Sequence, residues 1–128
     1  MTRPAARRRL RAGDVLRVEL PTLTPAGHEQ MGTRPAVVVG VPADLGPVRY
    51  PLLVVVPLTT QQGEWSASNR TLYPTLPAGA GGLTADSAAL LDNVRGVDAA
   101  RVRGFLGSLG APEVALLQAG LRELLGLQ

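Results

Sequence analysis

The fold is decided by two apolar runs, AVVVGV at residues 36–41 and LLVVVPL at residues 52–58. Valine is restricted at χ1 and favours strands, and a run without polar alternation is typical of a strand covered on both faces. Both runs therefore predict buried strands. Pro57 has no N–H to donate, which indicates that the second strand ends there or lies at a sheet edge.

A half-buried strand is predicted before these runs. Residues 14–20 (DVLRVEL) alternate apolar and polar side chains, so that Leu16, Val18 and Leu20 share one face. A loop rich in proline, threonine, glycine and polar residues follows from Pro21 to Thr33.

The middle of the chain is less regular. Residues 61–70 (QQGEWSASNR) predict a polar loop, residues 71–76 a short strand interrupted by proline, and residues 77–82 (PAGAGG) a turn. Residues 87–94 (SAALLDNV) fit a strand or a helix equally well, because periodicity alone does not separate the two over so short a run.

A C-terminal helix is predicted over residues 112–125. Pro112 suits the first turn, Glu113 the positive end of the dipole, and Gly126 the position after the end. Its apolar stripe comprises Val114, Leu117, Leu121 and Leu124. The sum is a mainly β fold, a small antiparallel β-barrel or curved sheet closed by this helix.

Composition excludes several kinds of chemistry. The 128 residues fit one domain and carry 13 basic against 10 acidic side chains, a formal net charge of +3. All the basic residues are arginine, which excludes P-loop NTPases and Schiff-base enzymes because both need a lysine amine. The absence of cysteine and the single histidine exclude thiol catalysis and the usual zinc clusters, so no metal site is expected.

The positive charge is concentrated at the N-terminus. Five arginines stand in the first 11 residues, and the remainder of the chain is slightly acidic. We expect residues 1–12 to form a disordered tail, either a nucleic-acid arm or a solubilising extension, and residues 13–128 to form the domain. No stretch has the composition of a signal peptide or the roughly 20 apolar residues of a membrane span, so a cytoplasmic protein is expected.

The most informative polar stretch is the loop that leads into the first buried strand. Arg34, followed by the rigid Pro35, is placed to present a guanidinium fork to a phosphate. Thr59 stands at the end of the second buried run. If the two strands are neighbours, both side chains open into one groove. The glycines at 79–82 and the Asp86-Ser87 pair lack the context of a phosphate cradle or a catalytic triad.

The order of these motifs resembles the MazF/PemK family, the ribonuclease toxins of bacterial toxin–antitoxin pairs. The resemblance covers about 115 residues, essentially everything but the tail. The motifs that carry it are Gly13-Asp14-Val15, Glu29-Gln30 with Gly32 and Arg34-Pro35, Pro57-Leu58-Thr59, Gly82-Leu83 with Asp86-Ser87, and Leu91-Asp92-Asn93-Val94-Arg95 with Val97-Asp98 and Arg101.

This resemblance implies an SH3-like barrel of the CcdB/MazF type that works as a homodimer in the bacterial cytoplasm. It implies a sequence-specific endoribonuclease that acts on single-stranded RNA without metal or cofactor and is inhibited by a cognate MazE-like antitoxin. The family's catalytic arginine and threonine correspond to Arg34 and Thr59.

RNA supplies its own nucleophile, so these residue types suffice for cleavage. Attack by the 2′-OH leaves a 2′,3′-cyclic phosphate and a 5′-OH end; Arg34 would stabilise the phosphorane and Thr59 would donate to it. Arginine is a poor proton acceptor. His28, where relatives often have a small residue, and Glu29 are therefore candidates for an acid or base, or for an RNA contact.

Five further residues are candidates for RNA binding. Trp65 either stacks on a base or packs over the barrel mouth, and Arg70 and Arg95 either track phosphates or are surface charges. Gln30 follows the acidic candidate, and Asn93 stands where the family commonly has Gln, so sequence specificity cannot be transferred from relatives.

Two other functions compete with the ribonuclease. The first is a CcdB-like toxin that binds gyrase and cuts no RNA, and the second is an antitoxin-binding module without activity. The pair formed by Arg34 and Thr59 favours the ribonuclease, since a protein that only binds has no need of it.

Overall fold

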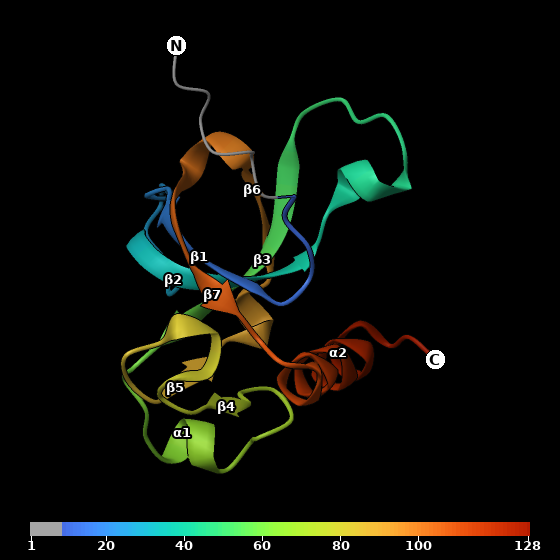
Figure 1. The fold of residues 1–128 in the computed structure, drawn as a ribbon. Helices are drawn as coiled ribbons and strands as arrows, with labels where there is room; N and C mark the ends of the chain where they lie inside the picture. The colour runs from blue at the N-terminus through green and yellow to red at the C-terminus, as the bar shows by residue number, and fades with distance from the viewer. Residues whose placement is uncertain (1–8) are drawn as a thin grey trace.

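The computed structural model describes residues 9–128, so most of the predicted tail lies outside the described residues. The described chain contains seven strands and two α-helices, with short 3₁₀ turns between them (Figure 1). The strands are β1 (Asp14–Leu20), β2 (Gly32–Gly40), β3 (Leu52–Thr59), β4 (Thr75–Leu76), β5 (Ser87–Ala89), β6 (Arg95–Asp98) and β7 (Val102–Ser108). The helices are α1 (Glu64–Ala67) and α2 (Ala111–Leu125).

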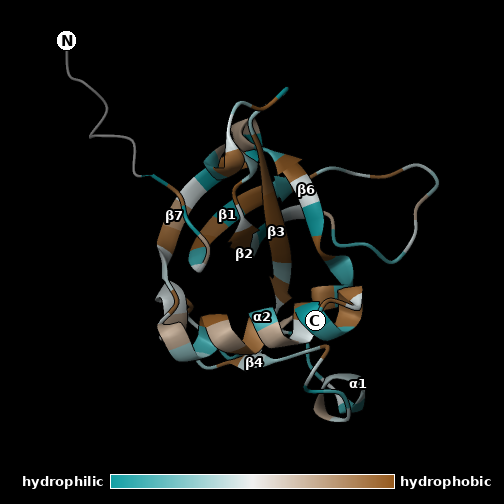
Figure 2. Ribbon diagram, turned by 90° about the vertical axis from the view of Figure 1, so that its right-hand side faces the viewer, coloured by the Kyte–Doolittle hydropathy of each residue, from teal (hydrophilic) through white to brown (hydrophobic). Residues whose placement is uncertain are grey.

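All strand pairs are antiparallel and follow the order β4-β5-β3-β2-β1-β7, with β6 also paired to β3. The sheet curls into a half-barrel, and α2 lies across its lower end (Figure 2). The predicted mainly β fold closed by a C-terminal helix is therefore confirmed.

The two apolar runs are buried on both faces, as predicted. In the β2–β3 ladder Val37 pairs with Val56, and both belong to the core cluster under α2. The next pair, Val38 with Val55, faces the other way into a second cluster inside the barrel. Because successive side chains of a strand point to opposite faces, an uninterrupted run of valines supplies both clusters at once.

The prediction that the strand ends at Pro57 or lies at a sheet edge is wrong, because β3 continues to Thr59 and has partner strands on both sides. The other edge of β3 is shared by β6, which pairs with residues 52–55, and β5, which pairs with residues 58–59. Pro57 lies between these two ladders, and its carbonyl accepts a hydrogen bond from Leu90 N on that side at 3.0 Å. The N–H and C=O of a strand residue point to the same side of the strand. The N–H that Pro57 lacks would therefore point between the β6 and β5 ladders, and no hydrogen bond of either ladder is lost.

Local structure differs from prediction in the polar segments. Strand β2 begins at Gly32, so the preceding loop is shorter than expected, and the loop at 61–70 contains the helix α1. Ser66 contributes to the N-terminal cap of this short helix: its hydroxyl accepts from Gly63 N at 3.1 Å and donates to Gly63 O at 2.9 Å. Of residues 71–76 only Thr75–Leu76 is strand. Residues 87–94, which fitted a strand or a helix equally well, contain both kinds of structure: strand β5 is followed by a 3₁₀ turn, Leu91–Asn93.

Helix α2 ends at Leu125 as predicted and begins at Ala111, one residue earlier than predicted. Glu113 accepts a hydrogen bond from Gly110 N at 2.9 Å, and Gly126 takes the left-handed conformation at φ 68°. Leu117 is buried, whereas Leu124 is 42% exposed, so the predicted stripe is wrong at its last member. Instead Gly120 is buried, and a Cβ there would lie 2.3 Å from Leu91 Cδ1, which brings α2 against the 91–93 turn.

Within residues 9–128, neither helix combines the length and apolarity that a membrane span requires.

Candidate active site

Arg34 and Thr59 lie at the same end of the β2–β3 pair. The ladder matches Ala36 with Pro57 and Val37 with Val56, and the same register continued by two residues sets Arg34 opposite Thr59. Opposed residues of an antiparallel pair project from the same face. Arg34 is exposed and Thr59 half-buried, so both can be reached from solvent.

The guanidinium of Arg34 is oriented by the protein backbone. Its Nε donates to the carbonyl of Met31 at 2.9 Å. Gly32, with φ 83°, provides the turn between them, a conformation that other residues rarely adopt. The two terminal nitrogens have no hydrogen-bond or ion-pair partner within residues 9–128. A fork held at its root with free outer nitrogens suits bidentate binding of a phosphate.

Thr59 is oriented in a similar way. Its Oγ1 accepts a hydrogen bond from Gln61 N at 3.1 Å. Accepting this bond leaves the hydroxyl proton free to be donated to another acceptor. The site thus presents two donors of different charge next to each other.

The loop before Arg34 is held by a side chain from β6, the strand that pairs with β3. Arg95, half-buried on β6, donates from Nη1 to the carbonyl of Gln30 at 3.1 Å. The structure therefore gives Arg95 a partner within the protein. The side-chain oxygen Oε1 of Gln30 is buried and has no hydrogen-bond partner among the described residues.

An open hollow of about 300 Å³ lies beside this loop, lined by His28, Glu29, Asp92 and Asn93. The carboxylate of Asp92 accepts a hydrogen bond from the Tyr73 hydroxyl at 2.6 Å. This bond raises the pKa of Tyr73, with further contributions from burial and from the negative charge of Asp92, so the phenol remains a donor at neutral pH.

Sequence reasoning missed Asp92 and Tyr73 as site residues. Asp92 stands inside a motif that was quoted only for its resemblance, and Tyr73 lies in an irregular segment without periodicity. Nothing local indicates that two residues 19 positions apart form a hydrogen bond.

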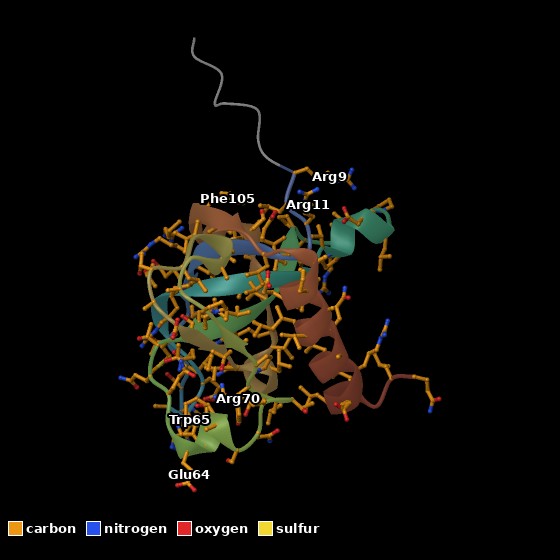
Figure 3. The ribbon with its side chains drawn as sticks, turned by 60° about the horizontal axis from the view of Figure 1, so that its bottom comes forward. Arg9, Arg11, Glu64, Trp65, Arg70 and Phe105 are labelled. Carbon is orange, nitrogen blue, oxygen red and sulfur yellow. The ribbon has the colours of Figure 1, made fainter. Side chains whose placement is uncertain are left out.

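Trp65 on α1 is 46% exposed and packs edge-on against the ring of Tyr73, with centroids 4.9 Å apart and an interplanar angle of 86°. Arg70 donates to the hydroxyl of Thr75. Figure 3 shows Trp65 and Arg70 at the same end of the molecule, opposite Arg9 and Arg11.

No group of three or more His, Cys, Asp or Glu side chains in residues 9–128 is arranged to hold a metal ion.

Residues 11–125 match the model of the PemK-like, MazF-like toxins of type II toxin–antitoxin systems. No curated protein matches the sequence significantly. Among solved structures, MazF from Deinococcus radiodurans is 30% identical with a TM-score of 0.68, over 91% of this chain and 96% of that one. A MazE–MazF complex from the same organism is 28% identical with a TM-score of 0.65, over 91% and 96%.

A mycobacterial endoribonuclease in complex with its cognate antitoxin is 19% identical with a TM-score of 0.65, over 91% of this chain and 95% of that one, and so shares the fold. The family match spans the barrel, the Arg34 loop, the 91–93 turn and α2. The chain therefore belongs to the PemK-like, MazF-like toxin family of type II toxin–antitoxin systems.

Proposed function

We propose that this MazF-like endoribonuclease toxin cleaves single-stranded RNA by attack of a ribose 2′-OH on the adjacent phosphorus, without a metal ion. The products are a 2′,3′-cyclic phosphate and a 5′-OH end. The observation that supports this most directly is that Arg34 and Thr59 lie at the same end of the β2–β3 pair, two residues beyond the Ala36–Pro57 pair, each held by a backbone partner and each with donors left over. The family match supports the same reaction class.

In this mechanism Arg34 directs its outer nitrogens at the non-bridging oxygens of the phosphate. These oxygens gain negative charge as the phosphorane forms, and a donor that is already oriented stabilises that charge without reorganising. The bond from Nε to Met31 O keeps the fork in place while the RNA binds. Thr59 donates its hydroxyl to the same phosphate, which helps align the attack.

The proton of the 2′-OH needs an acceptor, and the leaving 5′-oxygen needs a donor. His28 and Glu29 are the candidates because both line the hollow directly before the Arg34 loop. Imidazole and carboxylate side chains can exchange protons at neutral pH. A pH–rate profile of His28→Ala distinguishes the two, since only the loss of a limb near neutrality assigns the imidazole.

The proposed partners are a second copy of the chain and a MazE-like antitoxin, in the bacterial cytoplasm. The exposed leucines Leu116, Leu125 and Leu127 at α2 offer an apolar surface that a second copy would cover. The free fork of Arg34 offers a binding site for an acidic antitoxin segment, which would block RNA. The solved MazE–MazF complex of the Deinococcus radiodurans relative supports an antitoxin of that type.

The test is incubation of the purified protein with a mixed-sequence RNA in EDTA, followed by analysis of the product ends. We expect cyclic-phosphate and 5′-OH ends, and no cleavage of DNA because it lacks the 2′-OH. Arg34→Ala should abolish cleavage, whereas the matched variant Arg49→Ala should not, because Arg49 lies before the opposite end of β3. Intact RNA together with inhibition of gyrase would instead support the CcdB-like alternative.

A further inference from the structure

We propose that the hollow lined by His28, Glu29, Asp92 and Asn93 is a nucleobase subsite that selects guanine, with Trp65 stacking on the neighbouring base. This inference rests on the proposed ribonuclease function, and it assigns a role to Asp92, Tyr73 and Trp65 that the cleavage chemistry does not use. It names a sequence preference that no resemblance supplies, since Asn93 departs from the residue common in the family.

Charge determines which part of an RNA can enter the hollow. Two of its four lining side chains are carboxylates, Glu29 and Asp92, which disfavour a phosphate inside the hollow itself; His28 and Glu29, on the chain segment that leads to Arg34, remain the acid and base candidates for the ribose hydroxyl and the leaving oxygen. Arg34 follows Met31, the last residue of the same loop, by three positions, and its free guanidinium nitrogens attract a phosphate. An RNA strand therefore binds with its backbone toward Arg34 and an unpaired base directed into the hollow.

The hydrogen-bonding groups of the hollow match guanine better than the other bases. A carboxylate only accepts hydrogen bonds, and its two oxygens accept best from two adjacent N–H donors. On the Watson–Crick edge guanine presents N1–H and N2–H side by side, with the O6 acceptor next to them. Adenine and cytosine place an acceptor nitrogen beside their amino group, which would face the carboxylate unfavourably, and uracil has one donor.

Asp92 is the carboxylate that the structure orients for this role. Its Oδ2 already accepts from the Tyr73 hydroxyl at 2.6 Å, which restrains the side chain. Each carboxylate oxygen has a second lone pair, and Oδ1 has no partner within residues 9–128, so both can still accept from a base. The amide of Asn93, on the same 3₁₀ turn, can donate to guanine O6.

The position of this turn is determined from outside the site. Leu91 is buried and would clash with any Cβ at Gly120, so α2 packs directly on the turn. A carboxylate on a turn packed against a helix keeps its direction better than one on a free loop, and base discrimination depends on that direction.

Trp65 extends the subsite to a second nucleotide. The indole is 46% exposed, and its ring packs on the Tyr73 ring whose hydroxyl holds Asp92. Tyr73 therefore connects the aromatic surface to the guanine hollow. Every base has a face that can stack on such a ring, whatever its identity, so Trp65 adds affinity and Asp92 adds selectivity.

The test uses binding, so that it does not depend on catalysis. The probes are 2′-O-methylated uridine pentanucleotides that contain a single guanine at each position in turn, with matched all-uridine and inosine versions. The methyl group removes the nucleophile. Trp65 is the only tryptophan of the chain, so its fluorescence reports on this site alone. We expect guanine at one position to bind about 5- to 150-fold more tightly than uridine. Inosine, which lacks the 2-amino group, should lose most of that advantage.

Variants then assign the effect. Asp92→Asn should remove most of the guanine-to-uridine affinity ratio, and Tyr73→Phe, which keeps the carboxylate but not its orienting donor, should remove part of it. The charge-matched variant Glu123→Gln on α2 should leave the ratio unchanged. Thermal unfolding of each variant verifies that it is folded.

Equal affinity of the wild-type protein for the guanine, inosine and uridine probes would overturn the inference, whether or not Asp92→Asn folds. A guanine preference that survives in folded Asp92→Asn would overturn the role of Asp92. Failure of the proposed function looks different: the protein would bind the guanine probe selectively and yet leave the unmethylated RNA uncut.

Discussion

The two ends of the barrel both carry arginines, but they hold them in different ways. At the Arg34 end the guanidinium is anchored by a backbone carbonyl, and its outer nitrogens are free. At the other end Arg9 pairs with Asp44 at 3.0 Å, and its side chain is 83% exposed (Figure 3). An exposed ion pair contributes about 0–1 kcal/mol to folding stability, and the carboxylate offsets the positive charge of the arginine. A high net charge therefore says less about RNA chemistry than the orientation of one arginine.

The largest expected effect separates orientation from charge. Arg34→Lys keeps the positive charge but loses both the Nε bond to Met31 and the planar fork. We expect kcat for a cleavable RNA to fall about 100- to 1,000-fold, the usual cost of an oriented transition-state donor. The control variant Arg49→Lys should leave kcat unchanged. If Arg34→Lys kept full activity, charge alone would explain catalysis.

Thr59→Val removes one hydroxyl and preserves the shape of the side chain. A hydrogen bond to a charged group contributes about 1.5–3 kcal/mol, so kcat should fall about 10- to 150-fold. The substrate KM should change little, because the bond strengthens as the phosphate gains charge. Single-turnover rates measure this directly. Replacement of the adjacent exposed residue, Thr60→Val, is the matched control, and an equal loss in both variants would contradict the assignment.

Arg95→Ala tests whether an arginine at the site acts on the loop or on the RNA. Its bond to Gln30 O implies that it positions the loop. We expect unfolding free energy to fall by about 1 kcal/mol and cleavage by about 10-fold, with an unchanged dependence of binding on salt. A salt slope smaller by about one unit would show that Arg95 contacts a phosphate instead.

Deletion of residues 1–8 tests the basic end. Arg9 precedes β1, and β1 spans about 20 Å between that end of the barrel and the end that carries Arg34. A dinucleotide bound at Arg34 is too short to contact both ends, and its cleavage should change by less than about twofold. A longer RNA that loses affinity and salt dependence on deletion would establish the segment as an arm.

The smallest expected effect concerns Tyr73. Its raised pKa means that the folded protein holds this phenol proton more tightly than the unfolded chain. The resulting stabilisation is present below pH 10 and is lost as the pH rises through the folded pKa. In an alkaline titration followed by tyrosinate absorbance, the part of the signal that Tyr73→Phe removes should have its midpoint above pH 10. A midpoint at or below pH 10 for that part would contradict the Asp92 bond in solution.

Much of the fold could be predicted because the valine runs and the C-terminal helix are local patterns. A run such as residues 36–41 buries both faces wherever it is placed in a sheet, and the caps of α2 lie within a few residues of its ends. Pro57 was misinterpreted because its effect depends on which strands flank β3, and this is a property of the whole sheet. The helix α1 was missed because a single serine, Ser66, supports it.

Residue order and short-range periodicity were enough to predict strands β1, β2 and β3 and the closing helix, and the order of the motifs indicated the family and the candidates Arg34 and Thr59, whereas β6 and β7 were not predicted. The folded chain alone shows which groups meet: Arg34 donates to Met31 O, Arg95 donates to Gln30 O, and Tyr73 donates to Asp92. The two kinds of information differ in their range along the chain. Strand and helix formation depend on neighbours within a few residues. The hollow between His28-Glu29 and Asp92-Asn93 is lined by residues more than 60 positions apart, which meet only after the sheet has curled.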